Sequence, residues 1–223
     1  MNAFRSSFDG EIERWMQTDV GQTQQLLDQF REAGFGASRI ERAEMCHNDI
    51  TWVFEHKKGI PITMGILVIE AARRFDLLAY GLNFPGHFLV SIEDQLVDPI
   101  DMRVVLPDEV KAGAHSLEDL LAPATSTMVA LRMLNNIKAL HVQIGDLHEA
   151  LEIVDYQVAV DPDNRQSVSS LDFERGELWQ QLGAFTAAKA AFIQCAETSP
   201  TARLADRAQQ CADALTGKDE IWH

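Results

Sequence analysis

Two side chains in the middle of this sequence could carry out proton transfer: His87 in "NFPGHFLV" and Asp98 in "QLVDPI". An imidazole beside a carboxylate can act as a general base, because the carboxylate orients the ring and stabilises its protonated form. Both residues lie in short β-prone runs separated by "EDQ", which favours a hairpin turn. Two antiparallel strands joined in this way would place the side chains together. Taken alone, each residue also has a purely structural interpretation: His87 could be an edge histidine, and Asp98 could open an Asp-Pro turn.

Two amphipathic helices are predicted ahead of these strands. The first spans residues 9–33, with Asp9 as its N-cap, and it ends before Gly34 and Gly36. The second spans about residues 38–55 and ends at "KKG", where cations suit the negative end of a helix dipole.

A third helix, about residues 61–75, is predicted to form the centre of the core. Its sequence, "PITMGILVIEAARRF", is apolar on nearly every face, as in a helix that is buried on several sides. Pro61 suits the first turn, where its missing N–H has no helical partner. Short β-prone runs follow in "LAYGLNF", "HFLVSI", "QLVDPI" and "MRVVLP", and Ser116 opens a further helix with Asp119 at the capping-box position. A central helix followed by antiparallel strands, with flanking helices, predicts an α+β fold.

The C-terminal third contains an internal repeat. Three residues recur at a constant spacing of 38 residues, such that Gly145, Ala150 and Pro162 return as Gly183, Ala188 and Pro200. Their offsets match the second half of a tetratricopeptide repeat, in which Gly turns the chain, Ala allows close helix packing and Pro ends the second helix. "TARLADRAQQCADAL" would supply a capping helix. An ordinary helical bundle with coincidental glycines is the alternative.

These patterns divide the chain into two predicted domains. Residues 1–125 hold the central helix, the strands and the N-terminal helices. Residues 126–223 form an all-α region of two repeats plus the capping helix.

The net charge of −15 at pH 7 limits the class of partner. The sequence has no run of Lys or Arg that could neutralise phosphates, so direct binding to nucleic acid or to an anionic membrane is not expected. The start, "MNAFRSSFDGEIERW", lacks the apolar stretch of a secretory signal, and the longest apolar run, within residues 60–72, is too short to span a bilayer. Cys46, Cys195 and Cys211 fit neither a disulfide framework nor a zinc CxxC pair. A cytoplasmic protein with reduced thiols is therefore expected.

Residues from roughly 20 to 215 resemble the bacterial SirB family. The motifs that carry this resemblance are "GIPITMGIL", "GLNFPGHFLV", "VDPID" and "RMLNNIKA". The resemblance implies a transglutaminase-like (papain-like) core, in which a central helix packs on a small antiparallel sheet, followed by tetratricopeptide repeats. It also implies an association with gene regulation.

The same resemblance assigns the site residues. The wider superfamily begins its core helix with Gly-x-Cys and ends it near an Ala-Arg pair, here residues 72–73. Counting back puts the nucleophile at or next to Pro61, while His87 and Asp98 match the superfamily's histidine and aspartate. The resemblance therefore implies that the histidine and aspartate of the triad are kept, whereas the nucleophile is missing. The groove around His87 is expected to bind a ligand through Pro61, Thr63, Asn83, Pro85 and Gly86.

Three alternatives would restore chemistry to this site. Thr63 stands just after Pro61, but a Thr in the first helical turn more often satisfies backbone groups than attacks carbonyls. Cys46 precedes the core helix and could reach His87, although a free Cys beside apolar residues more often serves packing. The His87–Asp98 pair could instead activate a water. No cofactor and no metal are predicted, because the histidines and carboxylates lack tight ligand spacing.

Two functions follow from these observations. The first is a non-catalytic interaction or regulatory protein, which binds a protein or peptide partner and acts on transcription only through that partner, since the chain is acidic. The alternative is a cysteine-type hydrolase or acyltransferase, a peptidase or amidase, that uses a displaced nucleophile such as Cys46 with His87 and Asp98. The sequence leaves the partner, the substrate and the oligomeric state open.

Overall fold

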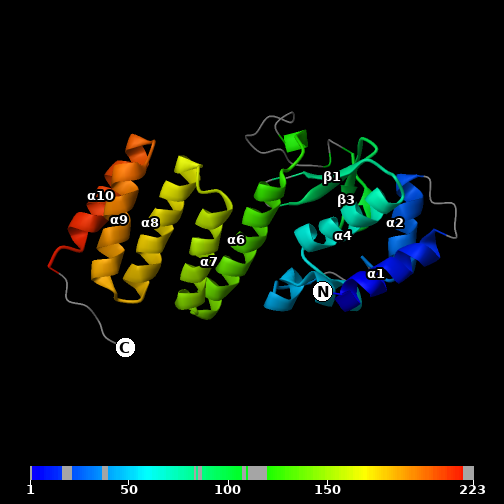
Figure 1. Ribbon diagram of the computed structural model, residues 1–223, viewed down its shortest axis with the longest axis horizontal. Coiled ribbons are helices and arrows are strands. Elements are labelled where there is room, and N and C mark those ends of the chain that lie inside the picture. Colours follow the sequence, from blue (N-terminus) through cyan, green and yellow to red (C-terminus); the bar gives the residue numbers. More distant parts are fainter. Residues whose placement is uncertain are drawn as a thin grey trace. The chain divides into compact units, whose positions relative to one another are not determined.

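The computed structural model describes residues 2–16, 22–36, 40–82, 84, 87–106, 109 and 120–217. The chain divides into two compact units, Met1–Val129 and Ala130–His223 (Figure 1). Across the described helices, none combines the length and the apolar character that crossing a bilayer requires.

The first unit places short helices before a small sheet. Its elements in chain order are α1 (Asn2–Trp15), α2 (Thr23–Glu32), the 3-10 helix η1 (Met45–Asn48), α3 (Ile50–His56), α4 (Pro61–Arg74), β1 (Ala79–Leu82), β2 (Leu89–Ile92), β3 (Gln95–Asp98) and β4 (Arg103–Val104). The predicted helix that opens at Ser116 falls mostly outside the described residues.

The single helix predicted over residues 9–33 is wrong, because the structure has two helices there. Asp9 does not cap a helix but lies inside α1, and its carboxylate pairs with Arg74 of α4. The start of α2 is set locally, where the side-chain oxygen of Gln25 accepts the Gln22 N–H at 3.1 Å. Both helices are amphipathic, so their combined periodicity concealed the break.

The helix predicted over residues 38–55 is also wrong in its extent. It is replaced by η1 and the shorter α3, which begins after Asp49. The Asp49 carboxylate accepts the N–H groups of Thr51 at 2.8 Å and Trp52 at 3.4 Å, and this N-cap starts a new helix. Lys57, with a φ of 60°, ends α3 in a left-handed conformation.

The predicted central helix and antiparallel sheet are confirmed. Helix α4 starts with Pro61 at its first position, and most of its residues are buried: Ile62, Thr63, Met64, Gly65, Leu67, Val68, Ile69, Ala71 and Ala72. The sheet has the order β1-β2-β3-β4 with antiparallel neighbours throughout. Glu93 and Asp94 make the turn between β2 and β3 with φ values of 48° and 62°.

One aromatic ring fills the contact between α4 and the sheet. A Cβ added at Gly65 of α4 would lie 2.7 Å from the Phe88 ring, and one added at Gly81 of β1 would lie 2.3 Å from it. Phe88 therefore fits only because glycine stands on both sides. The residues that follow Phe88 form β2, so this ring holds the strand against α4.

A separate apolar cluster forms away from this contact. Its buried members are Leu82, Phe84, Leu89, Leu96, Val105 and Leu120. One of its members, Leu82, bridges to Pro123, and Gly81 O accepts the Ala124 N–H at 2.8 Å. The segment at 120–124 thereby covers part of the outer edge of β1.

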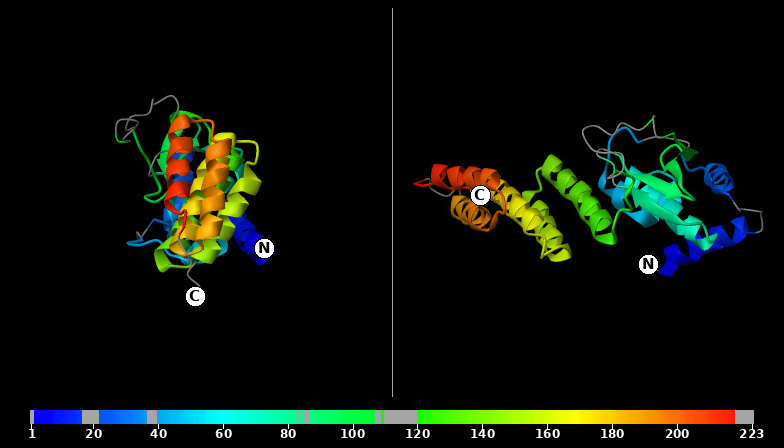
Figure 2. Two further views of the ribbon diagram at one scale, coloured as in Figure 1. Left: turned by 90° about the vertical axis from the view of Figure 1, so that its left-hand side faces the viewer. Right: turned by 90° about the horizontal axis from the view of Figure 1, so that it is seen from above.

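The C-terminal region is helical. It contains α6 (Ser126–Ile144), α7 (Leu147–Val160), α8 (Arg165–Gln181), α9 (Phe185–Thr198) and α10 (Ala202–Ala214). Helices α8, α9 and α10 lie side by side (Figure 2). Gly145 and Gly183 turn the chain with φ values of 81° and 75°, and Ala150 and Ala188 are fully buried after those turns.

Candidate functional site

The first turn of α4 carries no free nucleophile. Pro61 occupies its first position and has neither a reactive side chain nor an N–H. Thr63 is fully buried, and its hydroxyl lies 3.0 Å from the carbonyl oxygens of both His47 and Ile60. A hydroxyl has only one proton to donate, and the Thr63 hydroxyl directs it to these backbone carbonyl oxygens.

Close packing surrounds this turn, and only Pro61 keeps an accessible part. A Cβ added at Gly59 would lie 2.7 Å from a Val53 methyl group and 2.8 Å from the Thr63 hydroxyl oxygen. Gly59 and Ile60 are themselves buried. The Thr63 hydroxyl ties η1 to α4 through the His47 carbonyl.

His87 is exposed and lies just before the buried Phe88. Its backbone N–H donates to Phe84 O at 3.1 Å. The neighbouring site residues predicted from the sequence, Asn83, Pro85 and Gly86, lie outside the described residues.

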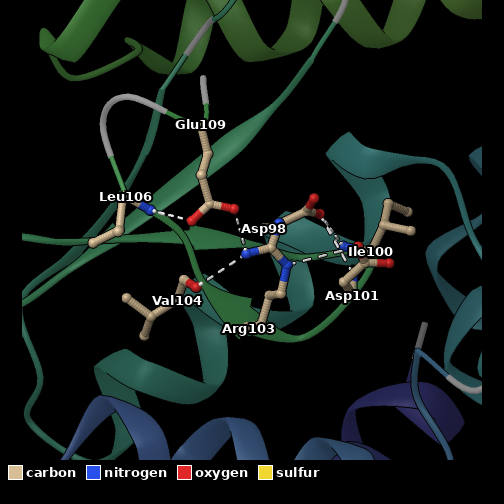
Figure 3. Close-up of polar contacts among 7 residues, drawn as sticks. All are labelled: Asp98, Ile100, Asp101, Arg103, Val104, Leu106 and Glu109. Carbon is tan, nitrogen blue, oxygen red and sulfur yellow. Dashed lines mark hydrogen bonds and ion pairs between the residues drawn. The ribbon is translucent and has the colours of Figure 1, made fainter. Parts of the chain in front are cut away.

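Asp98 is the last residue of β3 and is half-buried. Its carboxylate accepts the N–H groups of Ile100 at 2.8 Å and Asp101 at 3.4 Å, as Figure 3 shows. These bonds hold the Asp-Pro turn, which was the plain structural reading of this residue. Within the part of the chain that the structure describes, no hydrogen bond joins Asp98 to the His87 ring.

A charged cluster that the sequence did not predict lies beside Asp98 (Figure 3). Arg103, opposite Asp98 in the sheet, contacts the Glu109 carboxylate at 2.9 Å and the Asp101 carboxylate at 3.9 Å. The other Glu109 oxygen accepts the Leu106 N–H at 3.0 Å. The Leu106 N–H, and then Arg103, lower the pKa of Glu109. Only the charge-rich stretch from "DPID" to "PDE" hinted at this cluster.

Cys46 lies in η1 as a half-buried free thiol. The neighbouring His47 accepts the Glu44 N–H at its Nδ1, 2.9 Å away, and its ring packs edge-on against Trp52. Among the described residues, no hydrogen bond links the Cys46 thiol, or any hydroxyl, to the His87 ring.

The histidines and carboxylates of the described residues form no group of three or more that could hold a metal ion. His56, instead of facing a ligand set, stacks on Trp52 with the ring centroids 4.1 Å apart.

Comparison with known proteins finds relatives of low sequence identity that share one description. A "UPF0162 protein" of Xylella fastidiosa is 23% identical over 176 residues, covering 69% of this chain and 59% of the relative. Another, from Pseudomonas aeruginosa, is 28% identical over 141 residues, covering 58% of this chain and 50% of the relative. The chain thus spans between half and three-fifths of the length of these curated relatives. No solved structure gives a significant match.

The family itself is identified by the part of the chain that contains the site. Residues 3–135, which include α4, the four strands, His87 and Asp98, match the family model of the transglutaminase-like superfamily. This protein therefore belongs to the transglutaminase-like superfamily.

Proposed function

We propose that this protein is a non-catalytic binding protein built on a transglutaminase-like core that lacks its nucleophile. The observation that carries the proposal is the first turn of α4, where Pro61 has no N–H and the Thr63 proton is held by two backbone carbonyls. The beginning of a buried helix is where a thiol would be activated and an oxyanion bound. A site without either group binds a ligand but does not transfer an acyl group.

His87 and Asp98 then differ in role. The exposed His87 ring is available to a ligand, whereas the Asp98 carboxylate is engaged by the turn that follows β3. An extended peptide that lies along the groove would meet His87 as a hydrogen-bonding group. We propose a protein or peptide as this ligand, and an indirect role in gene regulation, because a net charge of −15 disfavours phosphate backbones.

We also propose that the chain is a SirB family protein whose C-terminal helices are tetratricopeptide-like. The equivalent left-handed turns at Gly145 and Gly183 support this assignment. So do the equivalent buried alanines, Ala150 and Ala188. Helix α10 would cap the array at its C-terminal end.

The first experiment asks whether Cys46 is a displaced nucleophile. Iodoacetamide labelling of Cys46 should proceed at the rate of an ordinary thiol, and His87→Ala should leave that rate unchanged. Labelling that is fast at neutral pH in the wild type and slow in His87→Ala would reveal an imidazole-activated thiol. That result, together with peptide or amide hydrolysis lost in Cys46→Ser, would replace this proposal with the hydrolase alternative.

The second experiment asks whether His87 belongs to a binding surface. Proteins captured from cell extract by the wild type should include one that His87→Ala fails to retain. His56→Ala is the matched control, because His56 is also exposed and lies in the same unit but stacks on Trp52. Identical partners for the wild type and His87→Ala would remove His87 from the function.

A further inference from the structure

A pocket of about 360 Å³ lies between α1, α3 and α4. Its apolar walls come from all three helices and comprise Phe4, Phe8, Ile50, Ile66 and Leu67. A volume of this size falls in the range of small-molecule sites in proteins. None of these residues is part of the predicted groove around His87.

Some residues that line the pocket pack against the core, and others keep an accessible surface that a ligand could cover. Phe4 and Phe8 stack with their ring centroids 5.9 Å apart, and each packs against the edge of Phe54. Phe8 and Leu67 are buried, but Phe4, Ile50 and Ile66 each keep an accessible part. A long apolar group could therefore bury itself against these half-buried side chains without displacing the core.

Two arginines and two carboxylates lie at the pocket, but only one of the arginines is paired with them. Arg74 is neutralised, since it pairs with Asp9 and, at 3.1 Å, with Glu70. The hydrogen bond to Asp9 is the main reason why the Arg74 pKa is raised. Arg5, one turn before Asp9 on α1, also lines the pocket and is exposed. Among the described residues, Arg5 has no ion pair and no hydrogen bond, whereas the Asp9 carboxylate pairs with Arg74.

We propose that this pocket binds a medium-chain fatty acid. The alkyl chain lies against Phe4, Ile50 and Ile66, and the carboxylate meets the Arg5 guanidinium. Apolar burial supplies most of the affinity, and the charge-assisted hydrogen bond at Arg5 selects an anionic head group. This site is separate from the one in the proposed function, and it does not require His87.

Calorimetric titration of the full chain with dodecanoate, below its micelle concentration, tests the proposal. We expect one molecule bound per chain, and Arg5→Gln should raise its Kd about tenfold. Dodecanol should bind the wild type and Arg5→Gln with the same Kd, since it has no charge to lose. Arg14→Gln is the matched control, because Arg14 is an exposed arginine of α1 that pairs with Glu11 away from the pocket.

A pocket-filling variant tests the location. Ile66→Trp should abolish binding of both dodecanoate and dodecanol while far-UV circular dichroism remains that of the wild type. If that variant unfolds, photo-crosslinking of a diazirine-bearing fatty acid to the wild type replaces it, and the label should map to peptides of α1, α3 or α4. His87→Ala should bind dodecanoate as the wild type does, which separates this proposal from the proposed function.

Several results would overturn the proposal. These are absence of dodecanoate binding to the wild type, an unchanged Kd in Arg5→Gln, or crosslinks outside the three helices. Tighter binding of dodecyltrimethylammonium than of dodecanoate would also overturn it, because Arg5 would repel a cation. A dimer that blocks dodecanoate would show that a second copy of the chain occupies the pocket.

Discussion

At the residue scale, packing in the core of the transglutaminase-like unit depends on two glycines, which have no Cβ atom. Phe88 reaches the helix–sheet contact because Gly65 and Gly81 have no Cβ. His87, its neighbour in the chain, is exposed, whereas Phe88 is buried between the two glycines. The position of the candidate binding residue is therefore set by packing of the residue beside it.

Gly65→Ala should destabilise the protein by about 1–3 kcal/mol, because its methyl group would overlap the Phe88 ring. The ring cannot move away from this methyl group, since its other side already packs against Gly81. Gly10→Ala is the control in another helix, where a Cβ would meet nothing within 4 Å. It should stabilise by up to about 1 kcal/mol through helix propensity. Urea unfolding measures both. Similar effects for the two variants would contradict the packing argument.

Cys195 gives a pH-dependent stability. Burial, followed by the charges of Asp172 and Cys211, raises its pKa from 9.0 to about 11. Above pH 9 the unfolded chain loses this proton while the folded protein keeps it, so stability is full below that pH and is lost as the pH rises towards 11. The loss should be roughly 2 kcal/mol. Unfolding free energies of the wild type and Cys195→Ala across this window should converge; parallel curves would exclude the assignment.

At the element scale, the C-terminal helices are tied together by a buried polar chain. Lys138 of α6 is 8% exposed, and its ammonium donates to Gln157 of α7 at 2.7 Å and to Glu174 of α8. Gln157 in turn donates to Asn135 of α6 at 2.7 Å. These bonds fix three helices relative to one another, because the four residues come from α6, α7 and α8.

Glu174→Gln should cost about 1–2 kcal/mol, because it leaves the buried Lys138 ammonium without its carboxylate. The cost stays below that of a fully buried pair, since Glu174 is 45% exposed. Glu177→Gln is the control on the same helix, where the partner Arg207 is exposed, and it should change stability by less than about 0.5 kcal/mol. Adding Lys138→Met to Glu174→Gln should recover most of the loss. A loss that persists in this double variant would mean that the ammonium is not its cause.

At the scale of the whole molecule, the dominant property is charge. The chain carries −15 at pH 7, with 34 acidic and 19 basic residues. Such an excess repels itself in the folded state and steers cationic rather than anionic partners to the surface. At the proposed pocket, Arg5 forms no ion pair with a carboxylate of the described residues.

Raising the NaCl concentration from about 20 mM to about 300 mM should therefore stabilise the protein, because salt screens the repulsion between like charges. We expect the thermal unfolding midpoint to rise by about 2–4 °C, equivalent to roughly 1 kcal/mol. Circular dichroism at the two salt concentrations measures this shift. A lower midpoint at high salt would show that the surface ion pairs outweigh the repulsion.

Much of the fold could be predicted from the sequence, because its signals are local. Pro61 and the apolar run after it predicted α4, and turn residues such as Glu93 and Asp94 separated the predicted strands. The same local reasoning joined α1 to α2, since periodicity continued across a break that the Gln22–Gln25 contact determines.

The sequence by itself determined that the core helix begins with Pro61 rather than with a cysteine. Only the tertiary structure decided that the Thr63 proton is held by His47 and Ile60 and that Asp98 serves its own turn. The pocket beside Arg5 also required the structure. The physical reason is the sequence separation of the interacting residues. Helix starts and turns depend on neighbours in the chain, whereas these contacts depend on how separate elements pack.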